Sequence, residues 1–152
     1  MTKIGDLKIE KAQLADLNKI IELEKQCFFS DAFFRHQFYY FINKSKSEFV
    51  VVRKHDKIIG YLIIQIRKNS LKYRIYSIAI APEARGMGIG KKLLEYTEQL
   101  ARKNKIQKIT LEVSEKNIAA INLYKKQGYR VVKTRAGYYT DGSSAWIMVK
   151  DI

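Results

Sequence analysis

Hydrophobic residues in the first third of the chain recur at the spacing of a helix. Between residues 14 and 27 the apolar positions fall three or four residues apart, which is typical of one buried helical face. They are Leu14, Leu17, Ile20, Ile21 and Leu23. The pattern predicts a helix that ends near Cys27. A second helix is expected through Phe41, with Ser30 or Asp31 as its N-terminal cap.

Between residues 49 and 81 the pattern changes to runs of β-branched and aromatic residues separated by short polar turns. Such runs favour strands. We expect strands over Phe49–Arg53, Ile58–Arg67 and Tyr73–Ala81, preceded by a short strand over Lys8–Lys11. The turns are short, so the three later strands are predicted to form an antiparallel meander.

The second half of the chain alternates helices and strands. An amphipathic helix is expected to begin just after a glycine-rich turn at residues 85–90, and a shorter helix over Ile118–Gln127 ends at Gly128. Strands are expected over Ile109–Val113, Tyr129–Thr134 and Ala145–Val149. The whole pattern predicts an α/β (α+β) fold with a mixed, mostly antiparallel central sheet covered by helices.

Length and composition limit the class of protein. A chain of 152 residues with 47% hydrophobic residues suits one packed domain over residues 1–152. No apolar run approaches the roughly 18–20 residues that cross a bilayer, and the first residues do not resemble a signal peptide. Cys27 is the single cysteine, so no internal disulfide forms and no metal site is expected. We expect it to be a small buried hydrophobic residue rather than a nucleophile, because neither His36 nor His55 is an evident partner. We therefore expect a cytoplasmic protein without membrane contact.

The net charge of +14 has two explanations. One is attraction to a polyanion, such as a phosphorylated cofactor, nucleic acid or a ribosome. The other is a solvated surface rich in lysine. The basic residues are scattered, and their longest runs are pairs such as Lys91-Lys92 and Lys125-Lys126. The second explanation is favoured for most of the charge, and sequence-specific binding of nucleic acid is not expected.

The segment Arg85-Gly86-Met87-Gly88-Ile89-Gly90 is the strongest candidate for a binding site. It joins a strand to a helix, and a helix N-terminus offers unpaired N–H groups and partial positive charge to a phosphate. Glycines let the backbone come close to such an anion. A P-loop would need Ser or Thr after the first lysine, and a dinucleotide fold would place the turn after its first strand. A turn with a purely structural role remains open.

Two segments together resemble the GNAT superfamily of N-acetyltransferases. The glycine turn is similar to the family's Q/R-x-x-G-x-G/A motif. Residues 111–124, Leu-Glu-Val-Ser-Glu-Lys-Asn-Ile-Ala-Ala-Ile-Asn-Leu-Tyr, resemble its L-E-V-x-x-x-N-x-x-A-x-x-L-Y segment. The L-E-V form, with Tyr138-Tyr139 further on, is similar to the branch that acetylates protein N-termini, including ribosomal-protein-alanine acetyltransferases. Two features depart from that branch: residues 27–31 lack its F-P-W-S-like stretch, and no proline follows Tyr139.

The resemblance implies a GNAT fold, with about six to seven strands and about four helices. It also implies acetyl-CoA as cofactor and the following roles. Glu112 would accept the proton of the amine, and Tyr124 would protonate the leaving thiolate. The cofactor would contact Ile78, Ala79 and Ile80 through their backbone, the residues Arg85, Gly86, Met87, Gly88, Ile89, Gly90 and Lys91, and Asn117. Phe28, Phe29, Tyr138 and Tyr139 would line the acceptor site.

The expected acceptor is a protein N-terminal α-amine, with a ribosomal protein as one candidate. Deprotonating an α-amine at pH 7 costs roughly 1 kcal/mol, whereas a lysine side chain costs about 4–5 kcal/mol. One carboxylate therefore suits an N-terminus better than a lysine. A small-molecule or lysine acetyltransferase of the same superfamily and a non-catalytic acyl-CoA-binding or ribosome-docking module remain as alternatives. The protein is expected to be a monomer or a homodimer.

Overall fold

The computed structural model describes residues 2–4, 6–28, 35–43 and 46–152. The chain forms two compact units. The first contains residues 1–65 and 77–89, and the second contains residues 66–76 and 90–152. The single domain over residues 1–152 stays a prediction.

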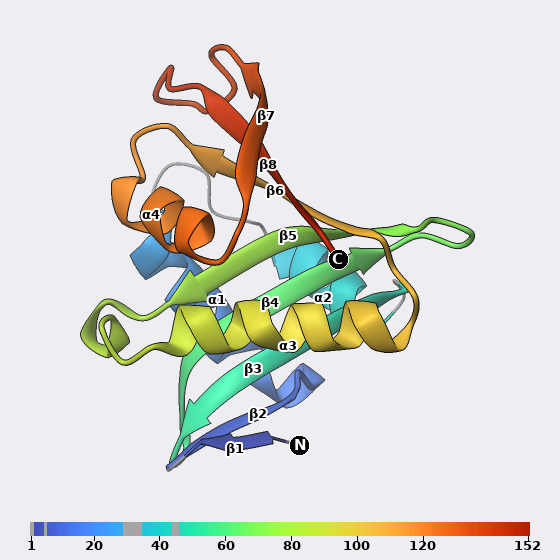
Figure 1. The fold of residues 1–152 in the computed structure, drawn as a ribbon. Coiled ribbons are helices and arrows are strands. Elements are labelled where there is room, and N and C mark those ends of the chain that lie inside the picture. Colours follow the sequence, from blue (N-terminus) through green and yellow to red (C-terminus); the bar gives the residue numbers. More distant parts are fainter. Residues whose placement is uncertain (1, 5, 29–34, 44–45) are drawn as a thin grey trace. The chain divides into compact units, whose positions relative to one another are not determined.

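The elements follow one another in the order expected from the sequence (Figure 1). In chain order they are β1 (Thr2–Ile4), β2 (Leu7–Lys11), the 3₁₀ turn η1 (Leu14–Asp16), α1 (Leu17–Cys27), α2 (Arg35–Asn43), β3 (Ser47–Lys54), β4 (Lys57–Ile66), β5 (Lys72–Ile80), the 3₁₀ turn η2 (Pro82–Ala84), α3 (Ile89–Lys103), β6 (Lys108–Ser114), α4 (Ile118–Lys126), β7 (Arg130–Arg135) and β8 (Ala145–Asp151). The predicted caps of α2, Ser30 and Asp31, lie outside the described residues.

The strands form a mixed sheet, which confirms the predicted fold class. Their order is β1-β2-β3-β4-β5-β6-β8-β7. Strands β5 and β6 run parallel, whereas β1–β2, β2–β3, β3–β4, β6–β8 and β7–β8 are antiparallel. The described residues give eight strands and four α-helices. One strand beyond the expected six to seven is β1, which is only three residues long and carries no clear hydrophobic alternation.

In the first unit, α1 and α2 pack on the same side of strands β3 and β4 (Figure 1). Ile20 and Leu23 of α1 are buried, as the helical spacing predicted. The ring of Phe38 on α2 lies 6.2 Å from that of Phe49 on β3 and 5.7 Å from that of Tyr61 on β4. Aromatic pairs at these distances stabilise a core beyond the area that they bury.

In the second unit, the helices lie against one face of the strands. Alternate residues of β6, namely Ile109, Leu111 and Val113, are buried. Contacts on that face include the ion pair between Lys150 of β8 and Glu98 of α3 and the stacking of Lys125 of α4 on Trp146 of β8. Because strand side chains alternate, the residues between the buried ones point to the opposite face. Glu112 is one of them.

No helix among the described residues is both long and apolar enough to cross a membrane.

Candidate active site

Glu112 lies on β6 at the centre of a polar cluster in the second unit. Its side chain is 15% exposed. Its Oε1 atom is 3.2 Å from the Arg74 guanidinium on β5 and 3.8 Å from the Arg135 guanidinium on β7. A hydrogen bond also joins Glu112 to the hydroxyl of Tyr138. The predicted proton acceptor is therefore a shielded carboxylate held by groups from three other segments.

A row of tyrosines leads away from Glu112. The hydrogen bond to the Glu112 carboxylate raises the pKa of Tyr138, and partial burial adds to the effect. The ring of Tyr138 meets that of Tyr139 edge-on at 5.0 Å. Tyr139 in turn is close enough to Tyr124 to act on it electrostatically. The second unit thus brings together four of the predicted site residues.

Tyr124 is buried on the inner side of α4, 5% exposed. Burial raises the pKa of its phenol, and Tyr139 raises it further. The Tyr124 phenol is protonated at neutral pH, as an ordinary tyrosine is, and this is the form that a proton donor needs. The Tyr124 ring also packs on Tyr129 at 6.0 Å between centroids.

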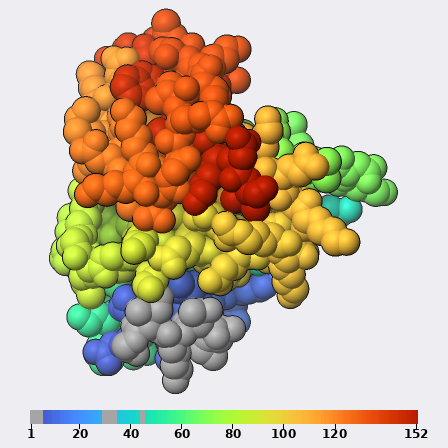
Figure 2. Space-filling model, viewed as in Figure 1, coloured from blue at the N-terminus to red at the C-terminus, as the bar shows by residue number. Residues whose placement is uncertain are grey.

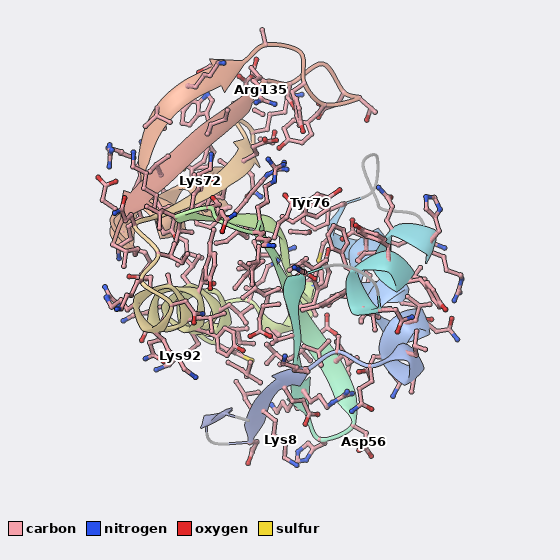
Figure 3. The ribbon with its side chains drawn as sticks, turned by 90° about the vertical axis from the view of Figure 1, so that its right-hand side faces the viewer. Lys8, Asp56, Lys72, Tyr76, Lys92 and Arg135 are labelled. Carbon is pink, nitrogen blue, oxygen red and sulfur yellow. The ribbon has the colours of Figure 1, made fainter. Side chains whose placement is uncertain are left out.

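The glycine turn has the backbone that an anion site needs. Gly86 and Gly88 adopt φ angles of 85° and 78°, which favour glycine. A side-chain Cβ built at either position would meet no atom of the described residues within 4 Å. Residues 85–88 are exposed, and α3 begins at Ile89 without an acidic residue in its first turn. Exposed Lys91 and Lys92 stand there instead, and Figure 3 labels Lys92.

The end of β5 directs alternate backbone groups to its two edges. Ala81 N–H donates to Ile59 O on β4 at 2.8 Å, and a Cβ on Gly60 of β4 would come within 3.1 Å of Ala79 O. Ala79 and Ala81 therefore face β4. The backbone groups of Ile78 and Ile80 face the other edge, because strand backbone groups alternate. These two residues suit strand-like pairing with an extended ligand, whereas Ala79 is already used by β4.

The side chain of Arg85 lies beside the end of α1. Its guanidinium is 3.9 Å from Cys27 Sγ, and the Cys27 thiol donates to Ile80 O at 3.3 Å. Cys27 was expected to be a small buried residue; it is only partly buried, and its thiol contacts the predicted cofactor strand. Burial raises the pKa of Cys27, and Arg85 opposes this rise.

Two further predicted residues have structural roles. Asn117 caps α4, since its Oδ1 accepts from Ala120 N–H at 3.2 Å. Phe28 ends α1, and its N–H donates to Glu24 O at 2.8 Å. Phe29 lies outside the described residues. Among the described residues no cluster of His, Cys, Asp and Glu could hold a metal.

Arg74 and Arg135 were missed by the sequence analysis. Arg74 alternates with buried Tyr73 and Ile75, so its outward direction could have been predicted. Its contact with Glu112 could not have been predicted, because that contact depends on the register of β5 against β6. Arg135 precedes the tyrosine pair and carries no motif of its own.

Comparison with known proteins identifies the family of the chain. The model of the acetyltransferase (GNAT) family matches residues 16–129. The chain belongs to this family. It is therefore an N-acetyltransferase, as expected from the two motifs.

Three relatives illustrate the similarity. An N-alpha-acetyltransferase of Sulfurisphaera tokodaii is 29% identical over 157 residues, covering 94% of this chain and 92% of the relative. A Bacillus subtilis (strain 168) protein, provisionally named as the alanine N-acetyltransferase of ribosomal protein bS18, is 31% identical over 142 residues, with 92% of each chain covered. The crystal structure of the ribosomal-protein-S18-alanine N-acetyltransferase from Escherichia coli superimposes with a TM-score of 0.86 at 25% identity, covering 96% and 94% of the two chains.

Proposed function

We propose that this acetyltransferase transfers the acetyl group of acetyl-CoA to the N-terminal α-amine of a protein. The single observation that carries the proposal is a cluster within the second unit: Glu112 is hydrogen-bonded to Tyr138, the rings of Tyr138 and Tyr139 lie 5.0 Å apart, and Tyr139 acts electrostatically on the buried phenol of Tyr124. It holds a shielded carboxylate and a buried, protonated phenol in the same unit. These are the two proton-transfer groups that direct attack on a thioester needs.

The chain's residues fit acetyl-CoA. The exposed turn with Gly86 and Gly88 at positive φ would bind the pyrophosphate through backbone N–H groups at the start of α3, with help from Lys91. Ile78 and Ile80 would pair with the pantetheine. The acetyl thioester supplies the group that is transferred.

Glu112 would take the first proton of the ammonium through a water molecule and release it to solvent, so that the neutral amine nitrogen can form a bond to the acetyl carbon. As the carbon–sulfur bond breaks, the nitrogen would lose its second proton to Glu112 through water, and Tyr124 would give its phenolic proton to the thiolate. The products are an N-acetylated chain and free CoA thiol; Glu112 then passes its proton to solvent, and Tyr124 regains one from solvent.

The names of the relatives support a protein N-terminus as acceptor, including that of a ribosomal protein. The cost of deprotonating the acceptor favours the same conclusion. At pH 7, deprotonation costs roughly 1 kcal/mol for an α-amine and about 4–5 kcal/mol for a lysine side chain, and a single carboxylate acting through water suits the smaller cost better.

The test is release of free thiol from acetyl-CoA with a panel of acceptors. The panel contains peptides that begin with Ala, Ser or Met, peptides with a blocked N-terminus and a free lysine, and polyamines. We expect turnover on free N-termini. Glu112→Gln and Tyr124→Phe should each lower kcat by about 10²-fold or more, as loss of an acid or base group usually does.

Matched controls separate chemistry from folding. Glu115→Gln removes a carboxylate just beyond β6, and Tyr129→Phe removes a buried phenol that packs on Tyr124. Both should keep wild-type turnover within a few-fold. Turnover on polyamines or blocked lysine peptides alone would refute the N-terminal acceptor. Cofactor binding without turnover on any acceptor would favour a binding module instead.

A further inference from the structure

The positive charge of the chain is concentrated in the second unit. Residues 66–76 and 90–152 contain 17 Lys and Arg but only 6 Asp and Glu. That unit therefore carries most of the net charge of +14. A uniform lysine-rich surface does not explain such a difference between the two units.

Strand register places many of these charges on the face that carries Glu112. Lys133 of β7 pairs with Ile147 of β8, which pairs with Glu112 of β6. Residues paired across neighbouring strands share a face. The same argument through β5, β6, β7 and β8 gives the charged members of this face: Lys72, Arg74, Lys108, Arg130, Lys133, Arg135, Glu112 and Asp151. Six cations thus share one face with two carboxylates, and we call it the cationic face.

Two arginines of the cationic face directly border the proposed proton acceptor. Their side chains are 34% exposed for Arg74 and 49% exposed for Arg135. Both guanidinium groups form ion pairs with the same carboxylate oxygen, Oε1 of Glu112. Two positive charges therefore face one negative charge, and the cluster keeps a net positive charge. Figure 3 shows these strands with Lys72 and Arg135 labelled, and Figure 2 shows the second unit from the side of α3 and α4, which is opposite the cationic face.

We propose that the cationic face selects acceptors with acidic side chains immediately after their N-terminal residue. The inference rests on the proposed function, because the acceptor amine must reach Glu112. An extended chain advances about 3.3–3.6 Å per residue. The second and third residues of an acceptor therefore lie within roughly 4–7 Å of the amine. The guanidinium groups of Arg74 and Arg135 lie 3.2 Å and 3.8 Å from Oε1 of Glu112, so they border an amine that reaches this carboxylate. Asp or Glu there gains ion pairs, whereas Lys or Arg is repelled.

The experiment compares kcat/KM for three peptides that differ at the second and third positions only. They begin Ala-Asp-Glu, Ala-Gln-Gln and Ala-Lys-Arg. The kcat/KM of the acidic peptide should exceed that of the neutral one by about tenfold. This is the factor expected from two exposed ion pairs near the upper end of their usual strength. The basic peptide should be worse than the neutral one. The preference should shrink as salt is raised, since exposed charges are screened.

Variants test which residues set the preference. Arg135→Gln should reduce the ratio of acidic to neutral peptide, and Arg135→Glu should invert it toward the basic peptide. The ratio is the readout, because any effect of Arg135 on Glu112 itself acts on all three peptides alike. Arg130→Gln is the matched control. Arg130 lies on the same strand and face as Arg135, but its guanidinium is hydrogen-bonded to Asp151. This substitution should leave the ratio unchanged.

Equal kcat/KM for the three peptides would overturn this inference while leaving the proposed function intact. Acetylation of polyamines or lysine side chains alone would overturn both. An RNA 20-mer that binds the wild type but not Arg135→Glu, with no effect of peptide charge on turnover, would assign the cationic face to nucleic acid and refute selection of acidic acceptors.

Discussion

Replacing Tyr61 by phenylalanine should destabilise the first unit more than an ordinary loss of a tyrosine hydroxyl. Tyr61 is fully buried on β4, and its hydroxyl donates to the carboxylate of Glu24, which is 1% exposed. The same hydroxyl lies 2.7 Å from Ser77 Oγ on β5. One atom therefore joins α1, β4 and β5, and Tyr61→Phe removes both hydrogen bonds together.

The two bonds differ in strength. A hydrogen bond to a charged group contributes about 1.5–3 kcal/mol, and one between neutral groups about 0.5–1.5 kcal/mol. The expected loss in the free energy of unfolding is therefore about 2–4.5 kcal/mol. For a chain of this length each kcal/mol shifts Tm by about 2–4 °C, so Tm should fall by about 4–18 °C.

Urea unfolding followed by circular dichroism at pH 7 measures this loss. Tyr73→Phe is the matched control: Tyr73 is a strand tyrosine, 2% exposed, whose hydroxyl accepts one hydrogen bond from the neutral amide of Asn104 at 2.8 Å. It should cost only about 0.5–1.5 kcal/mol. If Tyr61→Phe costs no more than Tyr73→Phe, the buried carboxylate does not depend on the Tyr61 hydroxyl and the reasoning fails.

Three further predictions concern the turn, the thiol and a buried phenol. Gly88→Ala should lower the free energy of unfolding by about 1–2 kcal/mol in urea, because its φ is 78°. Among the described residues a Cβ there meets no atom within 4 Å, so the loss comes from backbone strain; an unchanged midpoint would contradict this. Cys27 should react with iodoacetamide at pH 8 more slowly than in the urea-unfolded chain, because burial raises its pKa. Arg85→Gln should slow it further, and a faster reaction would show that Arg85 does not favour the thiolate. Tyr129→Phe should be neutral or stabilising by up to about 1 kcal/mol, since the buried Tyr129 hydroxyl finds no hydrogen-bond partner among the described residues; a loss above that size would reveal a missed partner.

Local patterns were sufficient for the elements and for part of the site. Helical spacing located α1, and alternation located β3 to β5. The glycines at 86, 88 and 90 were singled out as an anion-binding turn, and the first two adopt positive φ. Glu112 and Tyr124 were selected through a resemblance to a family motif, and their catalytic roles stay predictions.

The environment of those residues was harder to predict, for a physical reason. The partners of Glu112 come from β5, from β7 and from the segment that follows β7, and the separation along the chain reaches 38 residues for Arg74. Such contacts depend on strand register, where a shift of one residue turns every side chain to the other face. The partial exposure of Cys27 was also mispredicted, because it depends on how α1 meets β5 and Arg85.

By itself, the sequence determined the α/β order of elements, the membership of an acetyltransferase family and the identity of a glycine turn before a helix, because these depend on neighbours within a few residues. Only the tertiary structure decided that two arginines border Glu112 and that the cations of four strands share its face. It also decided that Ile78 and Ile80, rather than Ala79, turn their backbone away from β4. Strand pairing brings distant segments together, and a list of local preferences does not contain that information.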